Sequence, residues 1–310
     1  MSIQSKWDKV RKRSWDEIRD AWLADIPSFP ALGASPEPGL ERLPSLLIAD
    51  IPKVTEAPAR LTDVDGLRRN ALWEAVFLFH KCSHTHLAAQ RLGHIGMHSW
   101  CMFNAYHSAY LGARGILALL GVQLPNLLGK QVALDLFPEP VRRKASGGVR
   151  ILPAFNDFLI IRLPTQLDQQ GLWDGFQRLL RISTVTCWDM GLRNEVLGIS
   201  SKEITPPRNR FLYHPQYWPL TDLMDDQPIE ELKELIGDQL DVDGSGFLLR
   251  LGFTIYRLFE QLISDLANLS PIMQSQVDGS RALAAFALPE FGAYRSFLSQ
   301  TDVRATDIGL

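Results

Sequence analysis

The chain has few cysteines, no long uninterrupted apolar run and no excess of positive charge. Its cysteines are Cys82, Cys101 and Cys187, an odd number without a CxxC pair, which favours a reducing compartment over a disulfide framework. The apolar runs are too short and too interrupted to span a bilayer. A formal net charge of −3 excludes a global positive field that would attract nucleic acid or an anionic membrane. Any nucleic-acid contact must therefore be local.

The beginning of the chain also lacks the features of a secretory signal. Residues Ser2 to Asp25 carry charges throughout, whereas a signal peptide needs an uncharged apolar stretch. Together with the cysteine count, this predicts a cytoplasmic protein without a membrane partner. The 310 residues are 46% apolar, enough for a sizeable core in one large or two ordinary domains.

The most regular stretch is Leu67 to Val122, which predicts a long helical hairpin. Thr62 or Asp63 can cap a first helix that runs to about Arg91, and Gly93 can end it. The second helix is expected from about His94 to Leu120. Apolar residues recur in it at spacings of three and four, with small residues between them. This pattern predicts a buried central helix, whose broad apolar face comprises Trp100, Phe103, Tyr106, Tyr110, Ala113, Leu117 and Leu120.

The first 58 residues are expected to form an appendage to the helical domain. Ser2 to Ala24 reads as one amphipathic helix that needs a partner surface. Its basic cluster of Lys9, Arg11, Lys12 and Arg13 is either a phosphate or partner contact, or a solvated face. Seven prolines between Pro27 and Pro58 exclude a continuous helix and predict an extended arm. We therefore divide the chain into residues 1–58 and a helical domain over 59–310.

The remainder predicts further helices around one insertion. From about 125 to 164 the residues are β-branched or aromatic and partly alternate, which indicates short strands or irregular structure. Helices are expected over Leu172–Leu192, Ile229–Leu240, Phe247–Leu269 and Ala282–Leu298. The predicted fold class is mainly α: a helical bundle with an inserted irregular or small β element and an extended N-terminal arm.

A second basic cluster lies inside the insertion and comprises Arg142, Arg143, Lys144 and Arg150. Arginine and lysine at this density suit contacts with a phosphate backbone. A flexible solvated loop would have the same composition, so both interpretations stay open.

Six of the seven histidines fall between His80 and His107. The pairs His80 with His84 and His94 with His98 have the four-residue spacing that places metal ligands on one helical face. No carboxylate lies among them and the HExxH pattern is absent. The alternative is that these histidines lie at a helix surface or interface and titrate near neutral pH.

The segment RNRFLYH combines the groups that metal-free RNA cleavage requires. His214 offers a base for the 2′-hydroxyl proton, Arg208 a fixed cation for charge on the phosphorus, and Asn209 an orienting amide. Such a reaction leaves a 2′,3′-cyclic phosphate and needs no cofactor. The other interpretation is a structural corner, in which the aromatic residues of RNRFLYHPQYW pack on the bundle and Arg208 binds helix-terminal carbonyls.

The order of these elements resembles the HEPN family of all-α domains. The resemblance rests on the helix AYHSAYLGARGILALLGV, the following insertion, the helix LWDGFQRLL, and the R-N pair with a histidine six residues after the arginine. It spans about Leu67 to Leu269 and is specific at Tyr106–Leu120 and Arg208–His214. HEPN domains commonly carry an arginine, a neighbouring polar residue and a histidine four to six residues beyond the arginine.

The resemblance implies a metal-independent endoribonuclease of a prokaryotic antiviral defence or toxin–antitoxin system. Arg208 would bind the scissile phosphate, Asn209 would position it, and His214 would be the general base or acid. A homodimer is expected because HEPN subunits usually pair, and Arg142, Arg143 and Lys144 would guide the RNA backbone. The alternative is a non-catalytic HEPN-like interaction subunit that binds a partner protein or nucleotide, with the N-terminal arm contacting the partner.

Overall fold

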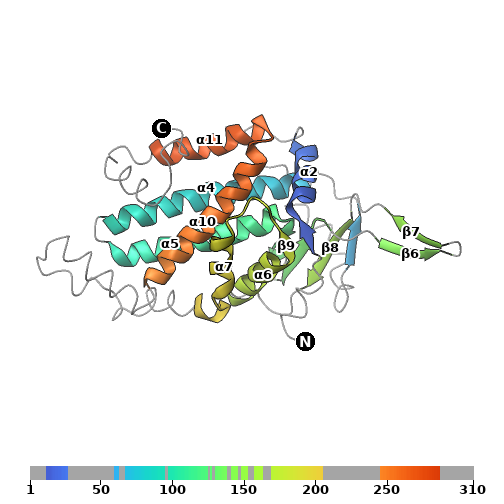
Figure 1. Cartoon of the computed structure of the whole chain (residues 1–310), viewed down its shortest axis with the longest axis horizontal. Coiled ribbons are helices and arrows are strands. Elements are labelled where there is room, and N and C mark those ends of the chain that lie inside the picture. The colour runs from blue at the N-terminus through green and yellow to red at the C-terminus, as the bar shows by residue number, and fades with distance from the viewer. Residues whose placement is uncertain are drawn as a thin grey trace, which may run out of the picture. The chain divides into compact units, whose positions relative to one another are not determined.

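The protein is described by a computed structural model, which covers residues 12–26, 59–62, 67–94, 97–124, 126–127, 130–137, 141–145, 148–152, 157–162, 169–204 and 245–286. The fold is mainly helical with small sheets (Figure 1), which confirms the predicted class. The chain forms two compact units. The first comprises Met1–Ala75 and Ala113–Pro206, and the second comprises Val76–Gly112 and Pro207–Leu310.

The predicted helical hairpin is confirmed and contributes residues to both units. It consists of α4 (Leu67–His94) and α5 (His98–Leu119). From Ala105 onward α5 buries most of its residues, as the mixture of large and small side chains predicts. Trp100 does not follow the prediction, because it lies in the first turn of α5 and is 48% exposed.

The start of the first unit differs from the predicted single helix. Arg13 and Ser14 form β1 (Arg13–Ser14), and α2 (Trp15–Asp25) follows, with residues 1–11 outside the described ranges. Trp15, Ile18 and Trp22 are buried. Arg13, predicted on a basic outer face, is also buried: it donates to Asp135 at 2.7 Å and to the carbonyl of Leu120. The prediction was wrong for Arg13, because a carboxylate 122 residues away compensates its charge.

Strands occupy the predicted insertion. One sheet is antiparallel and has five strands: β2 (Ala59–Thr62), β3 (Val122–Gln123), β4 (Asn126–Leu127), β5 (Lys130–Asp135) and β8 (Asp157–Arg162). Its order is β2, β8, β5, β3, and β4 also pairs with β5. β6 (Val141–Ala145) and β7 (Gly148–Leu152) form a separate two-stranded antiparallel ribbon (Figure 1). Gly121 turns the chain from α5 into β3 at φ 81°, a conformation that favours glycine.

The helix predicted over Leu172–Leu192 is interrupted. α6 (Gln169–Ile182) ends before β9 (Ser183–Thr184), which pairs in parallel with β1, and α7 (Met190–Gly198) begins later. The run from Ser183 to Thr186 is rich in β-branched residues, which are weak helix formers. Asp189 then caps α7, accepting hydrogen bonds from the backbone N–H groups of Gly191 and Leu192 at 2.7 and 3.2 Å.

The second unit contains the rest of α4 and α5 together with α10 (Ser245–Ala267) and α11 (Pro271–Phe286). α10 confirms the helix predicted over Phe247–Leu269. It approaches α5 closely at two glycines: a Cβ on Gly252 would lie 2.7 Å from the carbonyl oxygen of Ala105, and one on Gly112 would lie 2.8 Å from Cγ2 of Ile255. Glycine therefore allows the two backbones to pack directly against each other.

α11 begins eleven residues before the helix predicted from Ala282, because Ser270 and Pro271 form a start signal. The Ser270 side chain accepts from the N–H of Met273 at 3.4 Å, and proline is favoured in the first turn. The predicted segment Ile229–Leu240, residues 287–298 and the proline-rich arm lie outside the described residues, so the division at residue 58 stays a prediction. None of the described helices combines the length and hydropathy that crossing a bilayer requires.

Candidate functional site

The three predicted catalytic residues, Arg208, Asn209 and His214, lie between the described ranges 169–204 and 245–286. Their assignment as a site or as a structural corner stays a prediction. What the structure does describe is the backbone of the second basic cluster and most of the histidine-rich helices. These two regions belong to different units and are taken separately.

The second basic cluster lies in the β6–β7 ribbon instead of a loop. Arg142, Arg143 and Lys144 are consecutive on β6, and Arg150 lies on β7. In the register of the ribbon, Arg143 is directly opposite Arg150, whereas Arg142 is opposite Ile151 and Lys144 is opposite Val149. Residues that alternate along a strand lie on opposite faces. Each face of the ribbon therefore has two cationic positions.

The cationic ribbon carries no compensating acid of its own, since the sequence from Val141 to Leu152 contains four cations and no carboxylate. Like charges directly opposite each other across two strands are destabilising. A two-stranded ribbon is also marginal by itself, and in the part of the chain that the structure describes no third strand pairs with this one. An anion at the ribbon would relieve this repulsion.

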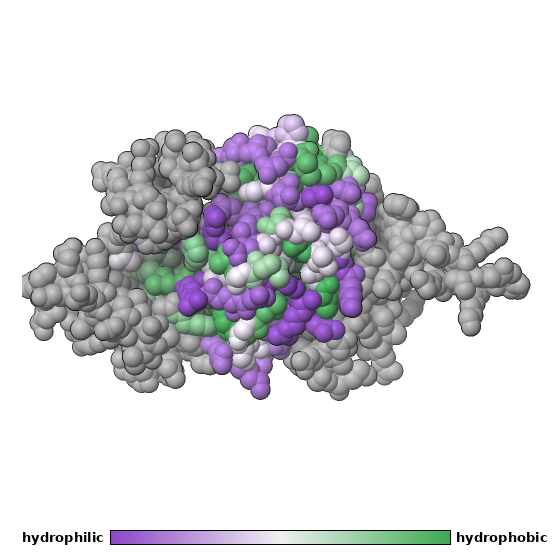
Figure 2. Space-filling model, in the orientation of Figure 1, coloured by the Kyte–Doolittle hydropathy of each residue, from purple (hydrophilic) through white to green (hydrophobic). Residues whose placement is uncertain are grey.

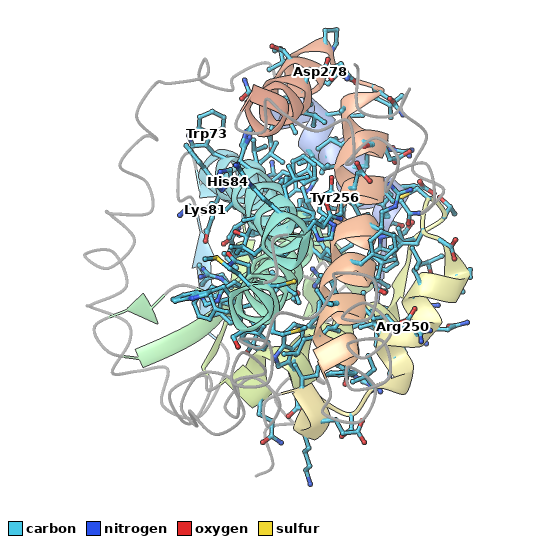
Figure 3. All side chains as sticks on the ribbon, turned by 90° about the vertical axis from the view of Figure 1, so that its left-hand side faces the viewer. Trp73, Lys81, His84, Arg250, Tyr256 and Asp278 are labelled. Atoms are coloured by element: carbon cyan, nitrogen blue, oxygen red, sulfur yellow. The ribbon has the colours of Figure 1, made fainter. Side chains whose placement is uncertain are left out.

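In the second unit, the histidines of α4 have contrasting environments. His86 is buried, accepts from the Gln90 amide at 3.0 Å and stacks on Tyr256, with ring centroids 4.6 Å apart. Burial, and then the charge of Arg257, lower its pKa to about 4. Burial also lowers the pKa of His80. His84 and Lys81 are exposed on the side of α4 that faces away from α10 (Figure 3).

These contacts favour a structural role for His86. A histidine that is neutral and stacked between helices is a poor general base near pH 7. Among the described residues no group of three or more histidine, cysteine or acidic side chains is placed to hold a metal ion. The side chains of His94 and His98 lie outside the description, so that predicted pair is untested.

The buried cysteines do not form a nucleophilic site. The Cys82 thiol donates to the carbonyl of Ser108 at 3.3 Å and joins α4 to α5. Burial raises its pKa to about 12, and burial raises the pKa of Cys101 to about 12 as well. A thiol with such a pKa remains protonated and unreactive at neutral pH. All three cysteines are free in the structure.

An aromatic row on the first half of α5 was only partly visible in the sequence. The Trp100 and Phe103 rings lie edge to face at 5.9 Å, and the Phe103 and His107 rings are 4.3 Å apart. The spacing of three and four predicted that Trp100 and Phe103 share a face, but it assigned that face to the core. Trp100 and Met97 are instead about half exposed. Figure 2 shows hydrophobic areas among hydrophilic ones on the face that it presents.

Comparison of the chain with protein-family models, curated proteins and solved structures found no match. The resemblance to HEPN domains therefore stays a hypothesis from the sequence. The geometry on which a function can be argued is that of the cationic ribbon.

Proposed function

We propose that this protein is a HEPN-like, metal-independent endoribonuclease that binds RNA through the β6–β7 ribbon. The observation that carries the proposal is the arrangement of Arg142, Arg143, Lys144 and Arg150 on two paired strands without an acid among them. A local cationic surface is what an RNA-binding protein with a net charge of −3 requires, because its overall field does not attract phosphates.

The catalytic step is assigned to the segment that resembles the HEPN motif. His214 would accept the proton of a ribose 2′-hydroxyl while the 2′-oxygen attacks the adjacent phosphorus. The P–O bond to the 5′-oxygen of the next nucleotide breaks, and that oxygen takes a proton from solvent water as it leaves. Arg208 would stabilise the additional negative charge on the phosphate oxygens, and Asn209 would orient the phosphate. The resemblance further suggests a homodimer in the cytoplasm that acts in prokaryotic antiviral defence or a toxin–antitoxin pair.

RNA degradation in the presence of EDTA tests this proposal. We expect the wild-type chain to cleave a single-stranded RNA with EDTA present, and His214→Ala and Arg208→Ala to abolish cleavage. His84→Ala is the matched control, because His84 is exposed on α4 and has no role in the proposed reaction. Cleavage that survives His214→Ala, or that stops when EDTA is added, would contradict the proposal. The second result would favour a metal site among the histidines of α4 and α5.

The exposed residues of α5 favour a second candidate, a non-catalytic interaction subunit. Met97, just before α5, and Trp100, in its first turn, are 46% and 48% exposed, and methionine and tryptophan are enriched at protein interfaces. The occupant that we propose is a second copy of this chain, because the resemblance to HEPN domains implies a homodimer. Light scattering should then give a dimer for the wild type and a monomer for Trp100→Glu. An inactive but dimeric wild type would support this candidate over the ribonuclease.

A further inference from the structure

The β6–β7 ribbon contains one position where two arginines oppose each other. Arg143 of β6 and Arg150 of β7 are direct cross-strand partners, one residue pair further from the turn than Lys144 and Val149. Directly opposite residues in an antiparallel pair share a face, with Cβ atoms about 4.5–5.5 Å apart. The register of the backbone therefore places two arginines at one position of the ribbon.

The neighbouring cations are not arranged in this way. Arg142 has Ile151 as its partner and Lys144 has Val149, both β-branched residues that suit a strand. Only the Arg143–Arg150 position, among those in the ribbon's register, combines two like charges. That arrangement opposes pairing of the strands, unless an anion between the two guanidinium groups changes the sign of the interaction.

We infer that Arg143 and Arg150 form a clamp for a single phosphate group of RNA. The inference rests on the proposed function and assigns it a specific contact. A guanidinium group presents N–H donors in a planar fork that matches two phosphate oxygens. Two arginines at directly opposite register positions would suit one phosphate, whose charge would offset the cross-strand repulsion. Arg142 and Lys144 occupy positions on the other face, where each would attract the RNA backbone without sharing a ligand.

The clamp predicts that the effects of Arg143 and Arg150 on RNA affinity are coupled, whereas general electrostatic attraction predicts independent effects. RNA binding by the full chain is measured through the fluorescence anisotropy of a labelled 2′-O-methyl oligouridylate, which lacks the hydroxyl needed for cleavage. Arg143→Ala and Arg150→Ala should each weaken binding about tenfold. The double variant should be little weaker than either single variant, because one phosphate requires both groups.

A control double-mutant cycle combines Arg142→Ala with Arg150→Ala, which removes the same amount of charge from the same ribbon. In this cycle the losses of RNA affinity of the two single variants should multiply, because Arg142 does not share the phosphate. Losing the clamped phosphate should also reduce the slope of log K against log salt by about 0.7. Multiplying effects in the Arg143–Arg150 cycle, or no binding by the wild type, would overturn the clamp.

Arg150→Glu separates loss of the clamp from damage to the ribbon. It replaces a like-charge pair by an opposite-charge pair, which favours pairing of the strands. We expect an unchanged or higher Tm together with at least tenfold weaker RNA binding, whereas unchanged binding would overturn the clamp. Failure of the clamp is distinguishable from failure of the proposed ribonuclease, since binding uses an uncleavable RNA and cleavage is measured separately with His214→Ala.

Discussion

Arg13 and Asp135 form a buried ion pair, with Nη2 and Oδ2 2.7 Å apart and both side chains at most 1% exposed. Arg13 begins β1 and Asp135 ends β5. The same guanidinium group donates to the carbonyl of Leu120, beyond the end of α5. One side chain therefore fixes the N-terminal segment, the end of the central helix and the sheet of the first unit.

Replacing Asp135 by alanine should destabilise the protein strongly. The substitution leaves the Arg13 charge buried without its carboxylate, which costs about 3–5 kcal/mol of unfolding free energy. Chemical denaturation measures the loss. Asp20→Ala is the control, because Asp20 is 74% exposed and its loss should change stability by less than about 0.5 kcal/mol. Equal effects of the two variants would show that the buried pair contributes little.

Gly252 and Gly279 should respond to alanine with opposite signs. A Cβ at Gly252 would press on the carbonyl oxygen of Ala105, so Gly252→Ala should cost about 1–3 kcal/mol. Gly279 lies inside α11 with nothing within 4 Å of the added Cβ, and Gly279→Ala should stabilise by about 0.5–1 kcal/mol. Thermal unfolding of both variants checks this. Stabilisation by Gly252→Ala would contradict the close crossing of α5 and α10.

His86 should make stability depend on pH. Its pKa is lowered from 6.5 to about 4, so the unfolded chain binds more protons in this window, and stability falls as the pH falls from about 6.5 toward 4. At pH 5 the loss is about 2 kcal/mol relative to pH 7. His86→Phe keeps a ring beside Tyr256 and should remove this component of the pH dependence. Identical pH profiles for wild type and variant would contradict the assignment.

Asp189 should stabilise the start of α7. Asp189→Ala removes the acceptor for the N–H groups of Gly191 and Leu192 and should cost about 0.5–2 kcal/mol. Asp189→Ser supplies another capping oxygen and should restore most of the loss. A serine variant as unstable as the alanine variant, in the same denaturation experiment, would show that the cap is not the cause.

The long helices could be predicted because their signal is local. α4, α5 and α10 repeat apolar residues at helical spacing over several turns, and these three were found nearly at their observed bounds. The small residues of α5 also indicated a close helix contact, which Gly112 makes with Ile255. Such patterns depend on residues three or four apart, which a sequence displays directly.

The errors arose where distant residues decide the structure. From the sequence alone Arg13 was predicted to be a solvated cation, because its partner Asp135 is distant in the chain. Ser183 was predicted to be helical, because the pairing of β9 with β1 is not visible in the sequence. The composition of the insertion indicated strands, but it did not give the register that opposes Arg143 to Arg150. Cross-strand partners are set by the turn between the strands and the pairing of whole segments, not by neighbours in sequence.

The products of RNA cleavage test the central claim most directly. The wild-type chain is incubated with a short RNA in EDTA, and the fragments are measured by mass spectrometry. The account predicts fragments that end in a 2′,3′-cyclic phosphate, and none from His214→Ala. Intact RNA with the wild type, or fragments that carry a 5′-phosphate and a 3′-hydroxyl, would contradict attack by the 2′-hydroxyl and with it the proposed ribonuclease.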